Sequence, residues 1–348
     1  MAAALQGALA FAGQNSVRPA SNGSDNGLLS ARGKPVQQPT GAPQYQIFDI
    51  GVVQAGDTAS HGFGVSQGGI AVGRSVRADG SQAFTWTLGS GIVGLPNLAG
   101  RAYAVANSAN DNGTVVGTAS KALFNADALP VIWQNGSVSQ HPLPPGQTVG
   151  NANSVNASGA AVGSANVQNK QRGVIYSGGS GSILTQTTAT GCYFVTALGI
   201  NDFGRIVGQG ADPNNAARNV GMVYDIGQPM AFEVGALPGM NGAIANGLNN
   251  SGSVVGTSMV DASAGVPFIW SDQGGIVAIP LVAGTSQGAA QAINSKGWVS
   301  ARTPGTLPFP SYTTARRPGV WPISFLPTQA GTWPRTHPRR RSVSAKTV

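Results

Sequence analysis

The sequence predicts an all-β protein, a β-propeller of about six four-stranded blades with the last blade incomplete. Two observations carry this prediction. A turn motif recurs about every 45 residues, which is typical of architectures that grow by stacking one supersecondary unit. In addition, 51 of the 348 residues are Gly and only 9% are charged, a composition that favours many short strands joined by tight turns over long amphipathic helices.

The N-terminal end is read as a targeting segment followed by a linker. Residues 1–12 contain a short apolar stretch that closes on Ala10-Phe11-Ala12, a small-x-small pattern that signal peptidase accepts. No basic n-region precedes it, so the segment is interpreted as a truncated signal peptide, and an Ala-rich disordered end is the alternative. Residues 13–44 are polar and rich in Ser, Asn, Gly, Pro and Gln, which predicts a disordered linker. No segment is apolar for long enough to span a membrane.

The repeat region is predicted to cover residues 45–301. Each copy of its motif is an Asn-x-x-Gly turn followed by a short apolar strand, and the copies end at positions 73, 117, 163, 208, 256 and 301. The spacing is therefore nearly constant. The six copies are Ser66–Gly73, Asn110–Gly117, Asn156–Gly163, Asn201–Gly208, Asn249–Gly256 and Asn294–Ala301.

Each unit is predicted to hold four antiparallel strands. A small or apolar strand precedes the turn, in which Asn bonds its own backbone and Gly adopts a positive φ. The Val-Val-Gly strand follows, then a polar insert, an aromatic strand, a Gly turn and a weaker strand that ends near Leu-Pro. Equivalent aromatic residues are expected to pack between blades and not to bind a ligand: Trp86, Trp133, Tyr176, Tyr224 and Trp270.

These residues resemble the HAF-repeat family of extracellular bacterial repeat proteins. The family carries a pattern of the form A-x-x-I-N-x-x-G-x-V-V-G beside a His-Ala-Phe signature. Ile200–Gly208 and Ala292–Gly297 match the turn closely, and Ser81–Trp86 matches the signature with Gln82 in the His position. No unit has that His, so the copies are divergent. The resemblance covers roughly residues 45–301 and implies secretion or surface exposure without an established catalytic activity.

The C-terminal segment, residues 302–348, does not continue the repeat. It is rich in Pro and contains Pro338–Arg341 but no acidic residue, and Pro interrupts the hydrogen-bond ladder of a sheet. A mistranslated gene end and a genuine basic, disordered extension are both open. Closure of the ring is expected from Gln46–Val53, which resembles a fourth strand and would pair into the sixth blade. That blade would lack a proper third strand, so an open or strained ring is a further expectation.

Charge and cysteine content exclude several classes of protein. The formal net charge is +8, but eight of the basic residues lie after residue 300, and the body is neutral. A neutral body offers no basic face for phosphates, which argues against nucleic-acid binding. Cys192 is the only cysteine, so the chain forms no internal disulfide and no thiolate metal cluster. It is expected to be a small buried apolar residue.

No catalytic, cofactor-binding or metal-binding residue is predicted. His61, His141 and His337 lie in different units or in the tail, so they do not form a zinc site. Asp111 and Asp202 recur in the turn, but the other copies lack an acid there, which favours a turn former over a Ca²⁺ ligand.

The preferred function is that of a secreted, non-enzymatic binding or structural module at the cell surface or in the extracellular matrix. We expect a monomer whose partners are carbohydrate or cell-surface components, with no cofactor. The inserts at 74–82, 118–128 and 209–219 would carry specificity. The alternatives are an extracellular propeller hydrolase or lyase with a channel site, and a non-functional gene fragment.

Overall fold

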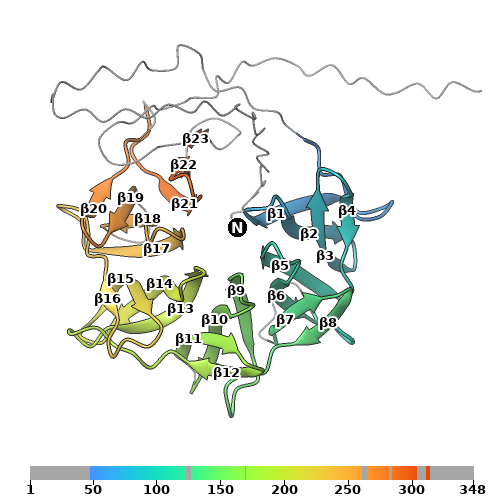
Figure 1. Ribbon diagram of the computed structural model, residues 1–348, viewed down its shortest axis with the longest axis horizontal. Coiled ribbons are helices and arrows are strands. Elements are labelled where there is room, and N and C mark those ends of the chain that lie inside the picture. Colours follow the sequence, from blue (N-terminus) through green and yellow to red (C-terminus); the bar gives the residue numbers. More distant parts are fainter. Residues whose placement is uncertain are drawn as a thin grey trace, which may run out of the picture.

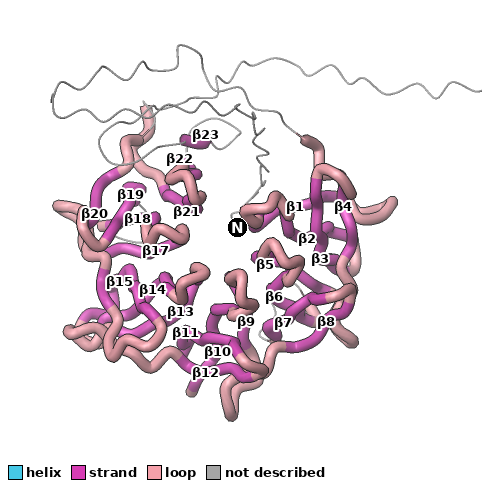
Figure 2. Tube along the Cα trace, in the orientation of Figure 1, coloured by secondary structure: helices cyan, strands magenta, loops and turns pink. Residues whose placement is uncertain are grey.

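The computed structural model describes residues 48–122, 127–168, 170–260, 265–281, 284–303 and 311–313. In these parts of the chain every regular element is a β-strand (Figure 2). The strands form six blades arranged around a common centre (Figure 1), of which the first two belong to one eight-stranded sheet, so the predicted β-propeller is confirmed. The N-terminal segment 1–12, the linker 13–44 and most of the tail 302–348 lie outside the described residues.

The strands follow the chain blade by blade. Blade 1 is β1 (Ala59–Val65), β2 (Ala71–Arg77), β3 (Gly80–Thr87) and β4 (Gly91–Gly94). Blade 2 is β5 (Tyr103–Ala109), β6 (Val115–Ser120), β7 (Leu129–Gln134) and β8 (Ser137–Gln140). Blade 3 is β9 (Gly150–Val155), β10 (Ala161–Val167), β11 (Lys170–Ser177) and β12 (Ser180–Ile183). Blade 4 is β13 (Tyr193–Ile200), β14 (Arg205–Asp212), β15 (Asn215–Asp225) and β16 (Phe232–Glu233). Blade 5 is β17 (Gly242–Leu248), β18 (Val254–Met259), β19 (Gly265–Ser271) and β20 (Gly275–Ala278). Blade 6 is β21 (Ala289–Ile293), β22 (Val299–Thr303) and β23 (Ser311–Thr313).

The antiparallel order gives the ring two different ends. Within a blade the first strand lies nearest the centre and the strands pair in sequence order (Figure 1). The Asn-x-x-Gly turns and the turns between third and fourth strands therefore share one end, here called the turn end. The hairpins between second and third strands and the links between blades share the other, the hairpin end. A single parallel bridge between Ser81 and Tyr103 joins blades 1 and 2.

The repeated Asn holds its own turn and also the next blade. In blade 3 the Asn156 side-chain oxygen accepts a hydrogen bond from the Ala160 amide at 3.0 Å, and Gly159 adopts φ +84° as predicted. The Asn156 side-chain nitrogen then donates to the Asn201 carbonyl of blade 4 at 3.1 Å. Asn110, Asn201 and Asn249 repeat this inter-blade bond. A chain of side-chain amides thus links blades 2 to 6 at the turn end.

The Gly of the Val-Val-Gly strand is required by close approach to the innermost strand. A Cβ at Gly163 would lie 2.0 Å from the Asn151 carbonyl oxygen, far inside van der Waals contact. Equivalent collisions at 1.9 to 2.1 Å would occur at the same position of blades 1, 2, 4 and 5, which are Gly73, Gly117, Gly208 and Gly256. In each of blades 1 to 5 the pairing of the first two strands contains a register shift. At this point a β-bulge brings the two backbones close together.

The core lies between blades. Each blade has a leading face, directed at the preceding blade, and a trailing face, directed at the following one. Trp133 on the leading face of blade 2 packs in one cluster with Val72 and Ala83 on the trailing face of blade 1. Tyr176 and Tyr224 are buried at equivalent seams, and Trp270 is partly buried in the next. The expected packing between blades is therefore confirmed for these four aromatics, whereas Trp86 packs against the segment before blade 1.

The segment before blade 1 does not complete the sixth blade among the described residues. Residues 48–53 form no strand. Instead Phe48, Ile50 and Val53 pack against Phe84 and Trp86 on the leading face of blade 1, and the Val53 amide donates to Ser75 Oγ at 3.1 Å. The expected pairing of this segment into blade 6 is therefore wrong for residues 48–53. No blade precedes blade 1, and the apolar side chains of this segment cover its leading face instead.

Blade 6 has three described strands, and it extends beyond the predicted boundary at residue 301. β22 runs to Thr303, and β23 pairs with it over Ala301–Thr303. The expectation that residues after 301 add no strand is therefore wrong for this stretch. No described strand of blade 6 pairs with blade 1, so the described strands form an open arc (Figure 1).

Candidate binding site at the hairpin end

The inserts that the sequence singled out lie together at the hairpin end. Residues 74–82 and 209–219 form the hairpins β2–β3 and β14–β15, and the described part of 118–128 belongs to β6–β7. β14 and β15 are the longest pair, with 8 and 11 residues. The hairpin of blade 2 is held by an ion pair, in which Arg101 Nη1 lies 2.6 Å from Asp127 Oδ2.

Most of the described cations that have no acidic partner also lie near this end. The ion pairs of the described residues use only Arg101, Arg205 and Arg218 as cations. The cations outside these pairs that flank the hairpins are Arg74, Arg77, Lys121, Lys170 and Arg172. At the turn end Arg205 is neutralised by Asp225 and Asp272. The neutral body of the chain therefore has positive charge available at one end.

Arg172 and Tyr193 form an aromatic and cationic pair across the seam between blades 3 and 4. The guanidinium carbon of Arg172 lies 4.0 Å from the centroid of the Tyr193 ring, within the range of a favourable cation–π contact. Both side chains are half-buried, whereas Lys170 beside them is exposed. The pair is thus fixed in place but still reaches solvent.

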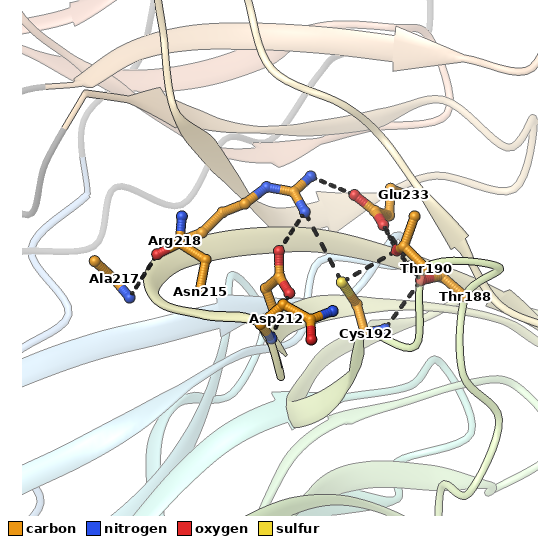
Figure 3. A network of polar contacts seen from close by, with 9 residues as sticks. Thr188, Thr190, Cys192, Asp212, Asn215, Ala217, Arg218 and Glu233 are labelled. Carbon is orange, nitrogen blue, oxygen red and sulfur yellow. Dashed lines mark hydrogen bonds and ion pairs between the residues drawn. The ribbon is translucent and has the colours of Figure 1, made fainter.

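A network of polar contacts includes Cys192, the residue next to Tyr193 in the sequence (Figure 3). The Cys192 amide donates to Thr188 Oγ1 at 3.1 Å, and the Glu233 carboxylate accepts hydrogen bonds from Thr188 and Thr190. Arg218 bridges Asp212, at 3.0 Å, and Glu233. The network therefore ties the link before blade 4 to the β14–β15 hairpin and to the outer strand β16.

The charged groups of this network are stabilised in their ionised forms. Burial acts to raise the pKa of the Glu233 carboxyl, but hydrogen bonds from Thr190 and Arg218 outweigh it and leave this pKa below its ordinary value. The hydrogen bond to Asp212, with a further one to Glu233, raises the pKa of Arg218 despite burial. These groups keep their charges near neutral pH and hold one another, so the network acts as a clamp on the chain segments that it joins.

Cys192 is buried, as predicted, but its surroundings are polar. Its side chain is fully inaccessible, its sulfur lies 3.4 Å from Thr190 Oγ1, and Arg218 Nη1 approaches it at 3.9 Å. A buried thiol cannot meet a substrate. Sequence reasoning missed the role of Glu233 and Arg218 here, because their partners Thr188 and Asp212 are identifiable only once the strands are paired. The sequence offered one indication of this role, because Glu233 is the only glutamate in a chain with few acidic residues.

The other residues considered from the sequence lie apart. Asp111 and Asp202 do not bond their own turns but accept hydrogen bonds from the preceding blade, at Gly68 and Ala157. Their carboxylates therefore serve as inter-blade acceptors. No group of three or more metal-ligating side chains occurs among the described residues. His141 stacks on Tyr176, far in sequence from His61 in β1, and His337 lies outside the described residues.

Within the described residues no helix is long and apolar enough to cross a membrane. A scan against models of protein families gives no match. A search of curated proteins gives none either.

Solved structures share the fold at low sequence identity. A structure from a study of two prolyl endopeptidases has a TM-score of 0.53 and 10% identity, over 78% of this chain and 43% of that one. TolB from Acinetobacter baumannii has a TM-score of 0.45 and 14% identity, over 67% of this chain and 55% of that one. The β-propeller domain of the trilobed protease from Pyrococcus furiosus has a TM-score of 0.48 and 12% sequence identity, over 78% of this chain and 80% of that one. The chain spans about half the length of the first two. At these identities the likeness concerns the fold, which is that of a β-propeller.

Proposed function

We propose that the protein is a secreted, non-enzymatic binding module that holds an acidic carbohydrate or a similar anionic cell-surface component at its hairpin end. One observation carries this proposal. The Arg172 guanidinium lies 4.0 Å over the Tyr193 ring and has no acidic partner among the described residues. A guanidinium binds a carboxylate with two parallel hydrogen bonds, while an aromatic face accepts the C–H groups of a sugar ring.

The environment of the pair supports binding over catalysis. The clamp of Arg218, Asp212 and Glu233 fixes the backbone next to Tyr193, and a preorganised site loses less entropy when a ligand binds. The pKa of Glu233 lies below its ordinary value and that of Arg218 above it, so both groups stay charged near neutral pH, whereas general acid–base catalysis favours a group whose pKa lies near the working pH.

The test is binding of purified full-length protein to immobilised polysaccharides, by biolayer interferometry, at low salt. We expect binding to polyuronates and weaker binding to neutral glucans. Arg172→Met removes the charge and keeps an apolar side chain, so it should weaken polyuronate binding at least tenfold. Tyr193→Ala should do the same.

Lys296→Met is the matched control, because Lys296 lies in the Asn294 turn at the turn end and enters no ion pair among the described residues. It should bind like the wild type. Equal losses in the Arg172 and Lys296 variants would show a non-specific charge effect and overturn the proposed site. Secretion is tested separately, by detecting the folded protein outside cells that express the full chain.

A further inference from the structure

We propose that Arg74, together with His61 and Phe63, forms a second binding site, for a small carboxylate with an apolar body, on the first two strands of blade 1. This site is separate from the Arg172–Tyr193 pair and does not rest on the function proposed above. Its elements are the two innermost strands of blade 1, β1 and β2, which lie next to the centre of the ring (Figure 1).

The strand pairing brings the three side chains together. His61 and Arg74 are directly paired in the antiparallel ladder, so their side chains are neighbours on the same face of the sheet. The Arg74 guanidinium carbon lies 5.8 Å from the centroid of the Phe63 ring. Phe63 follows His61 by two residues and is 37% exposed, so the aromatic wall of this group reaches solvent.

Arg74 departs from the repeat, and its charge is not compensated. The equivalent positions of blades 2 to 5 are Thr118, Ser164, Gln209 and Thr257. Three of these bond to neighbouring polar side chains, as Ser164 Oγ does to Asn151 at 3.2 Å. Arg74 enters no ion pair of the described residues, and its Nε is buried without a partner.

The half-buried position of Arg74 is unfavourable to folding. Burial lowers the pKa of its guanidinium, which means that the charged form loses hydration, and its Nε finds no hydrogen-bond partner in return. Blades 2 to 5 place an uncharged polar residue at this position, and only blade 6 has another arginine, Arg302. A ligand that neutralises Arg74 explains why blade 1 keeps a cation there. A carboxylate matches the fork of the guanidinium, and the Phe63 ring adjoins the apolar part of such a ligand.

The experiment compares benzoate with benzamide, which has nearly the same shape but no charge, on the full chain. Isothermal titration calorimetry and thermal unfolding are measured for the wild type, for Arg74→Met and for Arg77→Met. Met preserves the apolar stem of the side chain. Arg77 lies on the same strand, and its Nε is also buried without a partner, but its Nη2 donates to Gln82 at 3.3 Å. Arg77→Met is therefore the control for removing a nearby cation outside the proposed site.

We expect the wild type and Arg77→Met to bind benzoate at least tenfold more tightly than benzamide, and benzoate to raise their unfolding temperatures by mass action. Arg74→Met should lose this preference, and without ligand it should unfold at the same temperature as the wild type or at a higher one. Equal binding of benzoate and benzamide to the wild type, or no binding of either, would overturn the site. A lower unfolding temperature of unliganded Arg74→Met would instead show that Arg74 has a structural role.

Discussion

Glycine in the Val-Val-Gly strand shows how a single missing methyl group sets the geometry of a blade. The Asn151 carbonyl lies where the Cβ of residue 163 would be, so Gly163→Ala must push the first two strands of blade 3 apart. We expect a loss of about 3 kcal/mol in the free energy of unfolding, as for other overpacked sites, measured by urea denaturation. Gly89→Ala is the control, since nothing lies near its added Cβ. Equal stability of the two variants would refute the close-approach explanation.

His141 gives stability a dependence on pH. Burial lowers its pKa from 6.5 to about 4, its Nε2 has no hydrogen-bond partner, and its ring stacks on Tyr176 with centroids 4.9 Å apart. As the pH falls, His141 of the unfolded state takes up a proton before His141 of the folded state does. The free energy of unfolding is therefore highest above about pH 6.5 and falls as the pH decreases toward the folded-state pKa of about 4. The loss between these limits is at most about 3 kcal/mol.

His141→Phe preserves the stacking and removes the titration. The variant should therefore lose less stability than the wild type between pH 7 and pH 4, measured by chemical denaturation at a series of pH values. Parallel curves for the two proteins would mean that other groups cause the acid sensitivity.

At the scale of the element, the Asn turn has two functions that one variant can separate. Asp is as good a turn former as Asn, so Asn156→Asp preserves the acceptor for the Ala160 amide. The same variant loses the Asn156 side-chain nitrogen that donates to the Asn201 carbonyl, and a carboxylate oxygen then faces that carbonyl oxygen. If the inter-blade bond matters, Asn156→Asp should destabilise by about 2 kcal/mol, comparable to Asn156→Ala.

Urea denaturation measures the effect, and Asn135→Asp in an exposed turn is the control. Wild-type stability of Asn156→Asp would show that Asn156 serves only its own turn.

The period of the motif was enough to predict the blades, because a turn such as Asn201–Gly204 is a local structure in which Asn and Gly act through their own backbones. The contacts of the candidate site were beyond prediction, because they join distant residues. Arg172 and Tyr193 come from different blades, and Thr188 meets Glu233 across 45 positions. Arg74 was detectable as a departure from blades 2 to 5, but that it has no acidic partner among the described residues depends on the fold.

At the scale of the whole molecule, an arc of blades should respond locally to damage at its end. Each blade contacts mainly its neighbours, so stability is close to a sum of blade and seam contributions. Phe48 covers the leading face of blade 1, with its ring centroid 5.9 Å from that of Trp86. Phe48→Ala removes part of this cover, and we expect faster amide hydrogen exchange in β2 to β4 while β10 and β11 exchange as in the wild type.

Hydrogen exchange followed by mass spectrometry resolves these peptides. Phe203→Ala is the control, because Phe203 is 80% exposed and its removal should change neither region. If Phe48→Ala accelerates exchange equally in blades 1 and 3, the propeller unfolds as one unit, and the cover over blade 1 then stabilises the whole ring. If the change stays in blade 1, residues 48–53 act as a cap on the first blade, in the place where a closed propeller would have a preceding one.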